Sequence, residues 1–372
     1  MAEEESPHYP IIDSHIHLFP SSELETLAWC SPSNPLASQH SVSEYKTATG
    51  SPASLEGYIL LETDRKYDLE LGAKDGSGWE MPLMEVEFFK RIALGTPKEG
   101  EGHAKEDAKS CLAIIPWAPV PSGEEVLEGY VKEVERCAGE SFGKVKGFRY
   151  LMQEKPRGTM LTEEFVSGLK WLGSKGFVFD VGVDQHSGGK WQLEEAVEMI
   201  EKAHEGVPED EKLTFIINHL CKPDLSVYNQ TDPAFVAWRT AMFRLSKCDK
   251  TFMKLSGCFS EMSDSLKNAP IDEILLALQP YLVVILASFG SFRIMFGSDW
   301  PVCTIGVDDA WVKWRNVVQR FCDLASLSQE EQIMIWSGTA IKAYKLTELL
   351  SMVRMNPSQE LDGVKKRTES QK

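Results

Sequence analysis

Eight short apolar runs, rich in β-branched and aromatic residues, constrain the fold of this chain more than any other feature of its sequence. Near-continuous apolar runs are typical of strands that are buried on both faces of a parallel sheet. The runs span residues 9–19, 57–63, 111–119, 144–151, 176–184, 213–220, 251–257 and 293–301.

Segments with apolar residues at a spacing of three to four, the spacing of a helix, lie between most of these runs. They span residues 84–94, 123–139, 163–176, 192–206, 232–248 and 270–290. Strands that alternate with helices imply βαβ units and a parallel sheet. Eight such strands in a chain of 372 residues predict an α/β fold, a closed (β/α)8 barrel of the TIM type. A doubly wound open sheet is disfavoured because no GxGxxG follows the first run.

We expect one barrel domain over residues 9–350 and a polar C-terminal tail over residues 351–372. Two segments interrupt the strand and helix alternation. Residues 20–56 form a long Ser-, Pro- and Thr-rich loop after the first strand, on the face where barrel sites form, and we interpret this loop as a lid. An insertion follows the second strand, and we interpret its residues 96–110 as a plain solvated loop.

Charge and cysteine usage restrict the class of partner. A net charge of −17 argues against nucleic-acid binding, which needs a basic surface. Eight scattered cysteines without CxxC spacing, and no apolar leader, predict a reduced cytoplasmic protein. No run approaches the roughly 18 consecutive apolar residues of a membrane helix, so we expect no membrane association. We expect a monomer or a homodimer that acts on a small molecule.

The strongest local motif is Asp13-Ser14-His15-Ile16-His17, at the end of the first run. Alternate side chains of a strand share one face, so Asp13, His15 and His17 are expected to point into the barrel together. Buried imidazoles are costly unless they bond to something, which indicates a metal pair or a pair that polarises a carbonyl group. The alternative is two solvated loop histidines.

Two further strand ends carry titratable groups. Asp299 lies in GSDWP after the eighth run, and His219 lies in NHL after the sixth. Each has an ordinary alternative, since Asp299 could cap the next helix and His219 could be a partly exposed histidine. In a barrel, however, the ends of different strands converge on one place, and four convergent groups indicate an active site.

Five other residues are candidates for binding a substrate. Arg149 offers a rigid fork of donors, with a salt bridge to Glu62 as its alternative role. His186 is either a third imidazole ligand or part of a mobile Ser-Gly-Gly loop. Trp29 and Trp300 could stack on a ring, or they could serve packing alone. The absence of GxSxG, of a Walker loop and of HExxH argues against covalent serine catalysis.

In this order, the HxH of the first strand, HLCKP, MKLSG and GSDWP resemble the amidohydrolase superfamily of the amidohydrolase 2 type, and its sugar-lactonase branch in particular. DSHIHLFPSSELETLAWC, VKGFRYLMQ and GFVFDVGVDQHSGGKWQL are similar to segments of fungal L-rhamnono-1,4-lactonases. The resemblance covers roughly residues 9–345.

This resemblance implies hydrolysis of a sugar-acid lactone such as L-rhamnono-1,4-lactone, with Asp299 as the general base that activates water. His15, His17 and His219 would polarise the lactone carbonyl or bind one divalent ion, zinc or manganese. We expect His15, His17 and Asp299 as the metal ligands, with metal-free catalysis as the open alternative. We also expect burial beside Trp300 to raise the pKa of Asp299. A zinc-dependent decarboxylase of an aromatic or muconate-type acid, and a barrel that only binds or scaffolds, are the competing functions.

Overall fold

The computed structural model describes residues 9–349, so the predicted tail at 351–372 lies outside the described residues. All eight predicted strands are present. They are β1 (Ile11–Ile16), β2 (Leu55–Leu61), β3 (Cys111–Ile115), β4 (Gly147–Leu151), β5 (Val178–Gly182), β6 (Thr214–Ile217), β7 (Thr251–Leu255) and β8 (Ile294–Phe296).

The strands form two parallel ladders, β1-β2-β3 and β4-β5-β6-β7-β8, each in sequence order. Isolated parallel bridges join the ladders at both seams: Ile16 pairs with Trp300 at one, and Ile114 with Val145 and Trp117 with Arg149 at the other. This is the parallel, barrel-type α/β arrangement that the sequence predicted, and it brings the carboxyl ends of all eight strands to one face.

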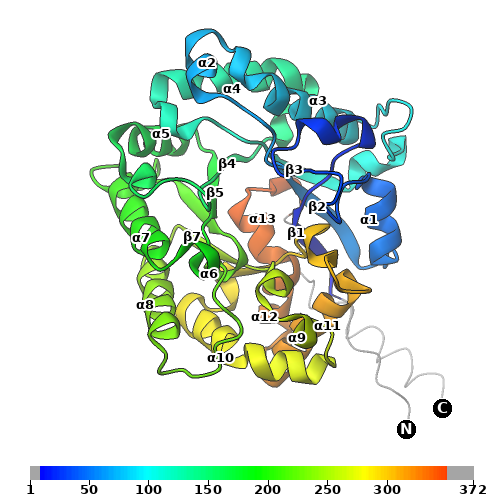
Figure 1. The fold of residues 1–372 in the computed structure, drawn as a ribbon, viewed down its shortest axis with the longest axis vertical. Helices are drawn as coiled ribbons and strands as arrows, with labels where there is room; N and C mark the ends of the chain where they lie inside the picture. Colours follow the sequence, from blue (N-terminus) through cyan, green and yellow to red (C-terminus); the bar gives the residue numbers. More distant parts are fainter. Residues whose placement is uncertain (1–8, 350–372) are drawn as a thin grey trace, which may run out of the picture.

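Helices surround the strands, as Figure 1 shows. Each helical segment predicted from the sequence is confirmed within a few residues. The α-helices are α1 (Val42–Thr49), α2 (Leu69–Asp75), α3 (Glu80–Leu94), α4 (Glu124–Ala138), α5 (Glu163–Ser174), α6 (Gln185–Gly188), α7 (Trp191–His204), α8 (Pro233–Ser246), α9 (Asp264–Lys267), α10 (Ile271–Phe289), α11 (Ala310–Leu324), α12 (Gln329–Ile333) and α13 (Thr339–Ala343).

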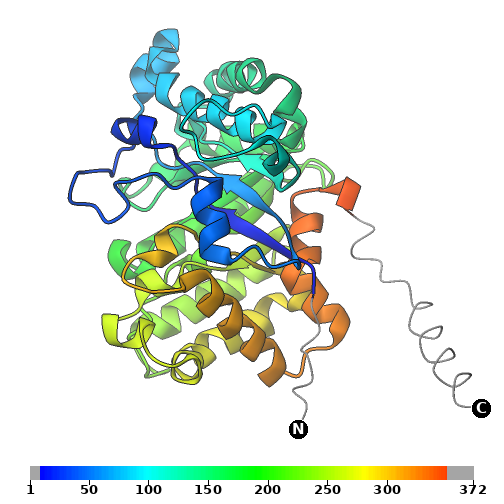
Figure 2. The ribbon, with the colours of Figure 1, turned by 90° about the vertical axis from the view of Figure 1, so that its right-hand side faces the viewer.

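Two layers of apolar side chains hold the barrel together. One layer lies between the strands and the outer helices. The other, which includes Ile12, Ile59, Val178 and Ile216, packs against residues of α13 and against Tyr344 behind it. Helix α13 and the loop before α1 lie on opposite sides of the molecule (Figure 2). The barrel is therefore plugged at one end, and its polar groups lie at the other.

Helix α10 is the one helix, among the described residues, that is long and apolar enough by length and composition to cross a membrane. A single helix of this kind is weak evidence of a membrane span, because the core helices of barrels share its composition. Ile274, Leu278, Leu282 and Ile285 of α10 are buried in the layer beneath the helices, whereas Leu276 and Val283 are exposed.

The two interrupting segments are more ordered than the sequence indicated. The segment 20–56 contains the 3-10 helix η1 (Ser21–Thr26) and α1. The interpretation of 96–110 as a plain solvated loop is wrong for part of its length, because the side chains of Glu101 and Asp107 are buried. Arg91 of α3 donates to Glu101 at 2.8 Å, and Lys46 of α1 pairs with Asp107. The insertion is thus packed onto the barrel by ion pairs that sequence spacing does not reveal.

Candidate active site

The carboxyl end of β1 carries a break in the alternation of its side chains. The pairing of β1 with β2 shifts register between Asp13 and Ile16. Asp13 therefore points toward the outer helices, where it accepts hydrogen bonds from Tyr45 of α1 and Trp311 of α11, both at 2.9 Å. The expectation that Asp13 shares a face with His15 and His17 is wrong, because a bulge reverses the facing of the residues that follow it.

Three imidazoles and one carboxylate meet at the mouth of the barrel. The Nε2 atoms of His15, His17 and His219 lie 3.5, 3.6 and 3.6 Å from the same oxygen, Oδ1 of Asp299. His15 Nε2 and His17 Nε2 are 3.1 Å apart. All four side chains are buried or nearly so. The residues that the sequence assigned to catalysis thus converge from the ends of β1, β6 and β8.

The backbone reaches this geometry through left-handed turns. His219, Leu220, Cys221 and Lys222 have φ angles between 48° and 62°, and Asp299 has a φ of 64°. Such conformations cost non-glycine residues about 1–3 kcal/mol each and cluster at functional sites. The turns after β6 and β8 direct His219 and Asp299 toward the axis instead of along their strands.

Gly257, directly behind His219, gives a test of this packing. Gly257 also has a left-handed φ of 64°, and a Cβ there would lie 2.4 Å from His219 Nδ1. We expect Gly257→Ala to displace the imidazole and to lower kcat about 10- to 100-fold, since misplacing a catalytic group by about 1 Å has effects of this size. Steady-state kinetics of the variant measure this loss.

The matched control is Gly50→Ala. Gly50 has a similar φ of 67°, but a Cβ there meets nothing within 4 Å. This variant carries the same backbone strain and should keep wild-type kcat. Equal activity of the two variants would contradict the contact with His219.

Burial controls the protonation of the site. It lowers the pKa of His219 to about 3 and that of His15 well below its ordinary value, with the Lys254 charge as a further cause for His15. For Asp299, burial alone would raise the pKa, but His219 and a hydrogen bond from His17 outweigh burial and bring the pKa below its usual value. The expectation of a raised Asp299 pKa is therefore wrong, and Asp299 is a carboxylate at neutral pH.

Two buried charges beneath the histidines did not emerge from the sequence. Lys254 of β7 and Asp180 of β5 are fully buried and form an ion pair of 2.6 Å. Lys254 Nζ also lies 3.1 Å from His15 Nδ1. Burial lowers the pKa of Lys254 to about 8, against the opposing effect of Asp180. Their signal in the sequence is one Lys and one Asp of opposite charge within two otherwise apolar strands.

A cleft of about 440 Å³ opens above His17. Glu62 and Arg149 face it, with 3.3 Å between Glu62 Oε1 and Arg149 Nε, which confirms the predicted pairing. Apart from this ion pair, neither of these two buried atoms has a hydrogen-bond partner among the described residues. Trp29 lines the cleft and donates from Nε1 to the Thr63 carbonyl at 2.8 Å. Apolar residues, among them Phe19, Val302 and Ile305, line the rest.

Two of the predicted substrate-binding residues do not line this cleft. Trp300 is buried against the rings of Tyr45 and His40, which favours its packing role. His186 contacts Glu261 at 2.9 Å and lies 3.8 Å from Asp224. In the structure it therefore connects loops at the strand ends.

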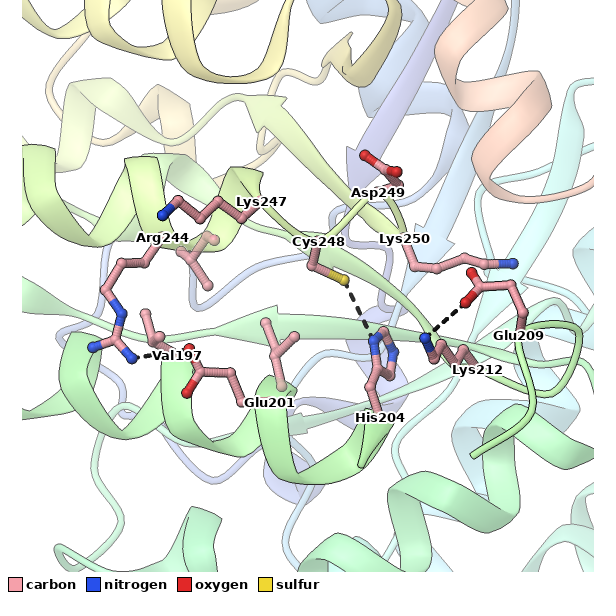
Figure 3. Close-up of a pocket in the computed structure, with 12 residues that line it drawn as sticks. Val197, Glu201, His204, Glu209, Lys212, Arg244, Lys247, Cys248, Asp249 and Lys250 are labelled. Carbon is pink, nitrogen blue, oxygen red and sulfur yellow. Dashed lines mark hydrogen bonds and ion pairs between the residues drawn. The ribbon is translucent and has the colours of Figure 1, made fainter. Parts of the chain in front are cut away.

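A second cavity, also of about 440 Å³, lies between α7, α8 and the segment before β7 (Figure 3). Two of its four cations, Arg244 and Lys212, are paired with Glu201 and Glu209, and Cys248 contacts His204 at 3.4 Å. Its residues precede the amino ends of β6 and β7. In barrels of this type that end carries stability and the carboxyl end carries chemistry, so the cleft above His17 is the candidate active site.

The donor set at the mouth suits a divalent ion. Single ligand atoms of His15, His219 and Asp299 lie within 4.8 Å of one another. Imidazole nitrogen and carboxylate oxygen are ligands that zinc takes. The group differs from the predicted set of His15, His17 and Asp299 by one histidine, and His17 Nε2 is as close to Asp299 as His219 Nε2 is.

Together, the barrel and the buried histidine and aspartate cluster at its carboxyl end define an enzyme that works at the mouth of a (β/α)8 fold. A model of the amidohydrolase family matches residues 12–346. The chain therefore belongs to the amidohydrolase family.

Similar proteins include two curated lactonases. The L-rhamnono-gamma-lactonase of Scheffersomyces stipitis is 34% identical over 345 residues, which cover 91% of this chain and 99% of that protein. The L-fucono-1,5-lactonase of Burkholderia multivorans is 30% identical over 216 residues, 58% of this chain and 67% of that protein.

Solved structures share the fold. A Burkholderia multivorans amidohydrolase with bound HEPES has a TM-score of 0.66 at 21% identity, over 90% of this chain and 99% of that one. A second structure of an amidohydrolase from that organism, with bound zinc, has a TM-score of 0.63 at 22% identity, over the same shares.

Proposed function

We propose that this protein hydrolyses the ester bond of a sugar-acid lactone, with L-rhamnono-1,4-lactone as the leading substrate. The observation that carries the proposal is the convergence of three imidazole Nε2 atoms on one oxygen of Asp299, at the edge of a cleft of about 440 Å³. The similarity to an L-rhamnono-gamma-lactonase over nearly the whole chain supports the choice of substrate.

The chemistry needs one base and donors for one oxyanion. Asp299 removes a proton from water, and the water oxygen attacks the lactone carbonyl carbon. Imidazole N–H groups at the mouth stabilise the oxyanion that forms, and one such donor contributes about 3–4 kcal/mol. The intermediate collapses with cleavage of the bond to the ring oxygen, which takes the proton back and leaves a hydroxy acid.

The sugar would lie between polar and apolar walls. Arg149 and Glu62, which form an ion pair in the wall of the cleft, carry donor and acceptor groups that suit ring and side-chain hydroxyls. Trp29 and the apolar residues Phe19, Val302 and Ile305 would cover the less polar edge of the sugar. A divalent ion held by His15, His219 and Asp299, with His17 beside them, would supply Lewis-acid polarisation of the carbonyl when bound. We further propose a cytoplasmic monomer or homodimer.

The pH dependence of substrate capture should reflect Glu62. Burial raises the pKa of Glu62 to about 7, against the lowering effect of Arg149. Glu62 is thus a carboxylate above this value and takes a proton below it, so we expect kcat/KM to fall as the pH drops through about 7. In Glu62→Gln this step should vanish. Glu154→Gln, at an exposed position of the same cleft, should keep it.

The proposal is tested with a pH-indicator assay on a panel of aldonolactones led by L-rhamnono-1,4-lactone. The panel includes five- and six-membered rings and is run with and without a chelator, after subtraction of spontaneous hydrolysis. We expect turnover of at least the leading lactone, and the chelator arm shows whether an ion is required. Absence of turnover from folded protein supplied with zinc or manganese would exclude the lactonase. Release of CO₂ from a dihydroxybenzoate in the same samples would then favour the decarboxylase.

A further inference from the structure

The turn that carries His219 into the site has a strained backbone. Its four residues, His219, Leu220, Cys221 and Lys222, have left-handed φ angles of 54°, 54°, 62° and 48°. Residues with a side chain adopt this conformation singly and rarely in succession. None of the four is a glycine, which would adopt it without strain. Contacts with the rest of the protein must therefore hold the turn in place.

The first half of the turn is held by two buried side chains. Trp238 of α8, which is fully buried, donates from Nε1 to the Leu220 carbonyl oxygen over 2.7 Å. Ser256, which follows β7, has its Oγ 2.9 Å from His219 Nδ1. These contacts fix Leu220 and the imidazole, but they do not reach the end of the turn at Lys222.

The end of the turn is held by Lys222. Its ammonium lies 3.2 Å from Glu261 Oε1 and 3.4 Å from Asp184 Oδ2, and its carbonyl oxygen accepts a hydrogen bond from the His186 backbone N–H over 3.0 Å. Glu261 follows β7 and Asp184 follows β5. Lys222 therefore connects the loops after three consecutive strands, at the end of the barrel that carries the site.

The two ion pairs of Lys222 are shielded from solvent. The Lys222 side chain is 19% exposed, and those of Glu261 and Asp184 are 5% and 8% exposed. Exposed ion pairs contribute little because water and salt screen them, whereas partly buried pairs are screened much less. The ammonium of Lys222 can therefore keep the last residue of the turn in a fixed place.

We infer that Lys222 is a positioning residue that holds the strained turn after β6 and thereby keeps His219 beside Asp299. His219 Nε2 lies 3.6 Å from Asp299 Oδ1, and it needs this place whether it polarises a lactone carbonyl or binds an ion. Lys222 does not line the cleft, so it acts through the backbone of the turn. The expected effect on turnover rests on the proposed function, whereas the effect on the turn does not.

Hydrogen exchange tests the inference without any substrate. The backbone N–H groups of Cys221 and Lys222 donate to the Asn218 and His219 carbonyl oxygens at 2.9 and 2.7 Å. With a chelator present, so that no ion holds His219, we expect a peptide that covers the turn to exchange at least about tenfold faster in Lys222→Met than in the wild type. Lys222→Arg keeps a cation at this position and should exchange like the wild type. Equal exchange in the wild type and Lys222→Met would overturn the inference.

Kinetics test the effect on the reaction. We expect Lys222→Met to lower kcat about 10- to 100-fold with KM within about threefold, because a catalytic group is misplaced while the cleft walls remain. Lys222→Asn also lacks the ammonium, but asparagine adopts left-handed conformations more readily, so it should keep at least about fivefold more of kcat than Lys222→Met. Lys212→Met is the control, because Lys212 pairs with Glu209 at 2.7 Å at the opposite end of β6 and should leave kcat unchanged.

Equal kcat losses in Lys222→Asn and Lys222→Met would assign the effect to the lost charge and overturn the inference, as would an unchanged kcat in Lys222→Met. If Lys222→Met folds poorly because Glu261 and Asp184 lose their cation, Lys222→Met/Glu261→Gln removes one of these buried charges and should show the same faster exchange and the same loss of kcat. Absent lactone turnover by the wild type would reject the proposed function, while the exchange experiment still decides the role of Lys222.

Discussion

Asp299→Asn is expected to lower kcat for lactone hydrolysis about 10²- to 10⁴-fold, the range supplied by a positioned general base. Asparagine keeps the size of the side chain but cannot remove a proton from water. Asp299 Oδ1 lies within 3.6 Å of the Nε2 atoms of His15, His17 and His219, which is why we propose Asp299 as the base. KM should change little, because the cleft walls formed by Arg149 and Glu62 remain.

The control for this variant is Asp184→Asn. Asp184 follows β5 at the same end of the barrel, where it caps α6 and pairs with Lys222 at 3.4 Å. It does not line the cleft, and asparagine also caps helices well. Steady-state kinetics should therefore give near wild-type values for it. An Asp299→Asn enzyme within about tenfold of the wild type would mean that the base lies elsewhere.

Arg65→Met is expected to destabilise the fold by about 3–5 kcal/mol, the cost of leaving buried charges without their partner. The Arg65 side chain is fully buried and pairs with Glu23 at 3.0 Å and with Glu85 at 3.2 Å. It also donates to the Glu23 carbonyl at 3.2 Å. Arg65, Glu23 and Glu85 form a buried triad. It connects α3, which carries Glu85, to the segment that carries Glu23 and leads into the cleft wall, so we expect KM to rise as well.

Urea unfolding followed by circular dichroism measures the free energy of unfolding of this variant. Burial raises the pKa of both Glu23 and Glu85, against the opposing charge of Arg65. Without Arg65 these carboxylates take protons more readily. We therefore expect the variant to lose less of its free energy of unfolding in mild acid than above neutrality. Arg136→Met is the control, because its pair with Glu133 is exposed and exposed pairs add little to stability. Similar losses of the free energy of unfolding in both variants would contradict the proposed contribution of the Arg65 triad to stability.

The sequence predicted the strands, and the convergence of the four candidate catalytic side chains at the strand ends, for a shared physical reason. Strands buried on both faces need continuous apolar runs, and a titratable group such as His219 or Asp299 at the end of such a run must face the barrel mouth. The order of runs and helices then defines the fold, without knowledge of any contact.

Other features depend on contacts between distant segments. Strand periodicity predicts that the side chains after Asp13 lie on the same face as Asp13. The bulge after Asp13 turns them to the opposite face, and only the pairing with β2 reveals it. The Lys254–Asp180 pair joins β7 to β5, and the Arg65 triad joins three segments of the chain. The lowered pKa of Asp299 has the same origin, because the groups around it outweigh its burial. Each of these results from packing in three dimensions.

The most direct test of the central claim is hydrolysis of L-rhamnono-1,4-lactone in ¹⁸O-water, with mass spectrometry of the sugar acid. Water attack at the carbonyl predicts one ¹⁸O atom in the carboxylate, none in the hydroxyl released from the ring, and a rate far above that of Asp299→Asn. Label in the released hydroxyl, or a rate no greater than that of the variant, would contradict lactone opening at this site.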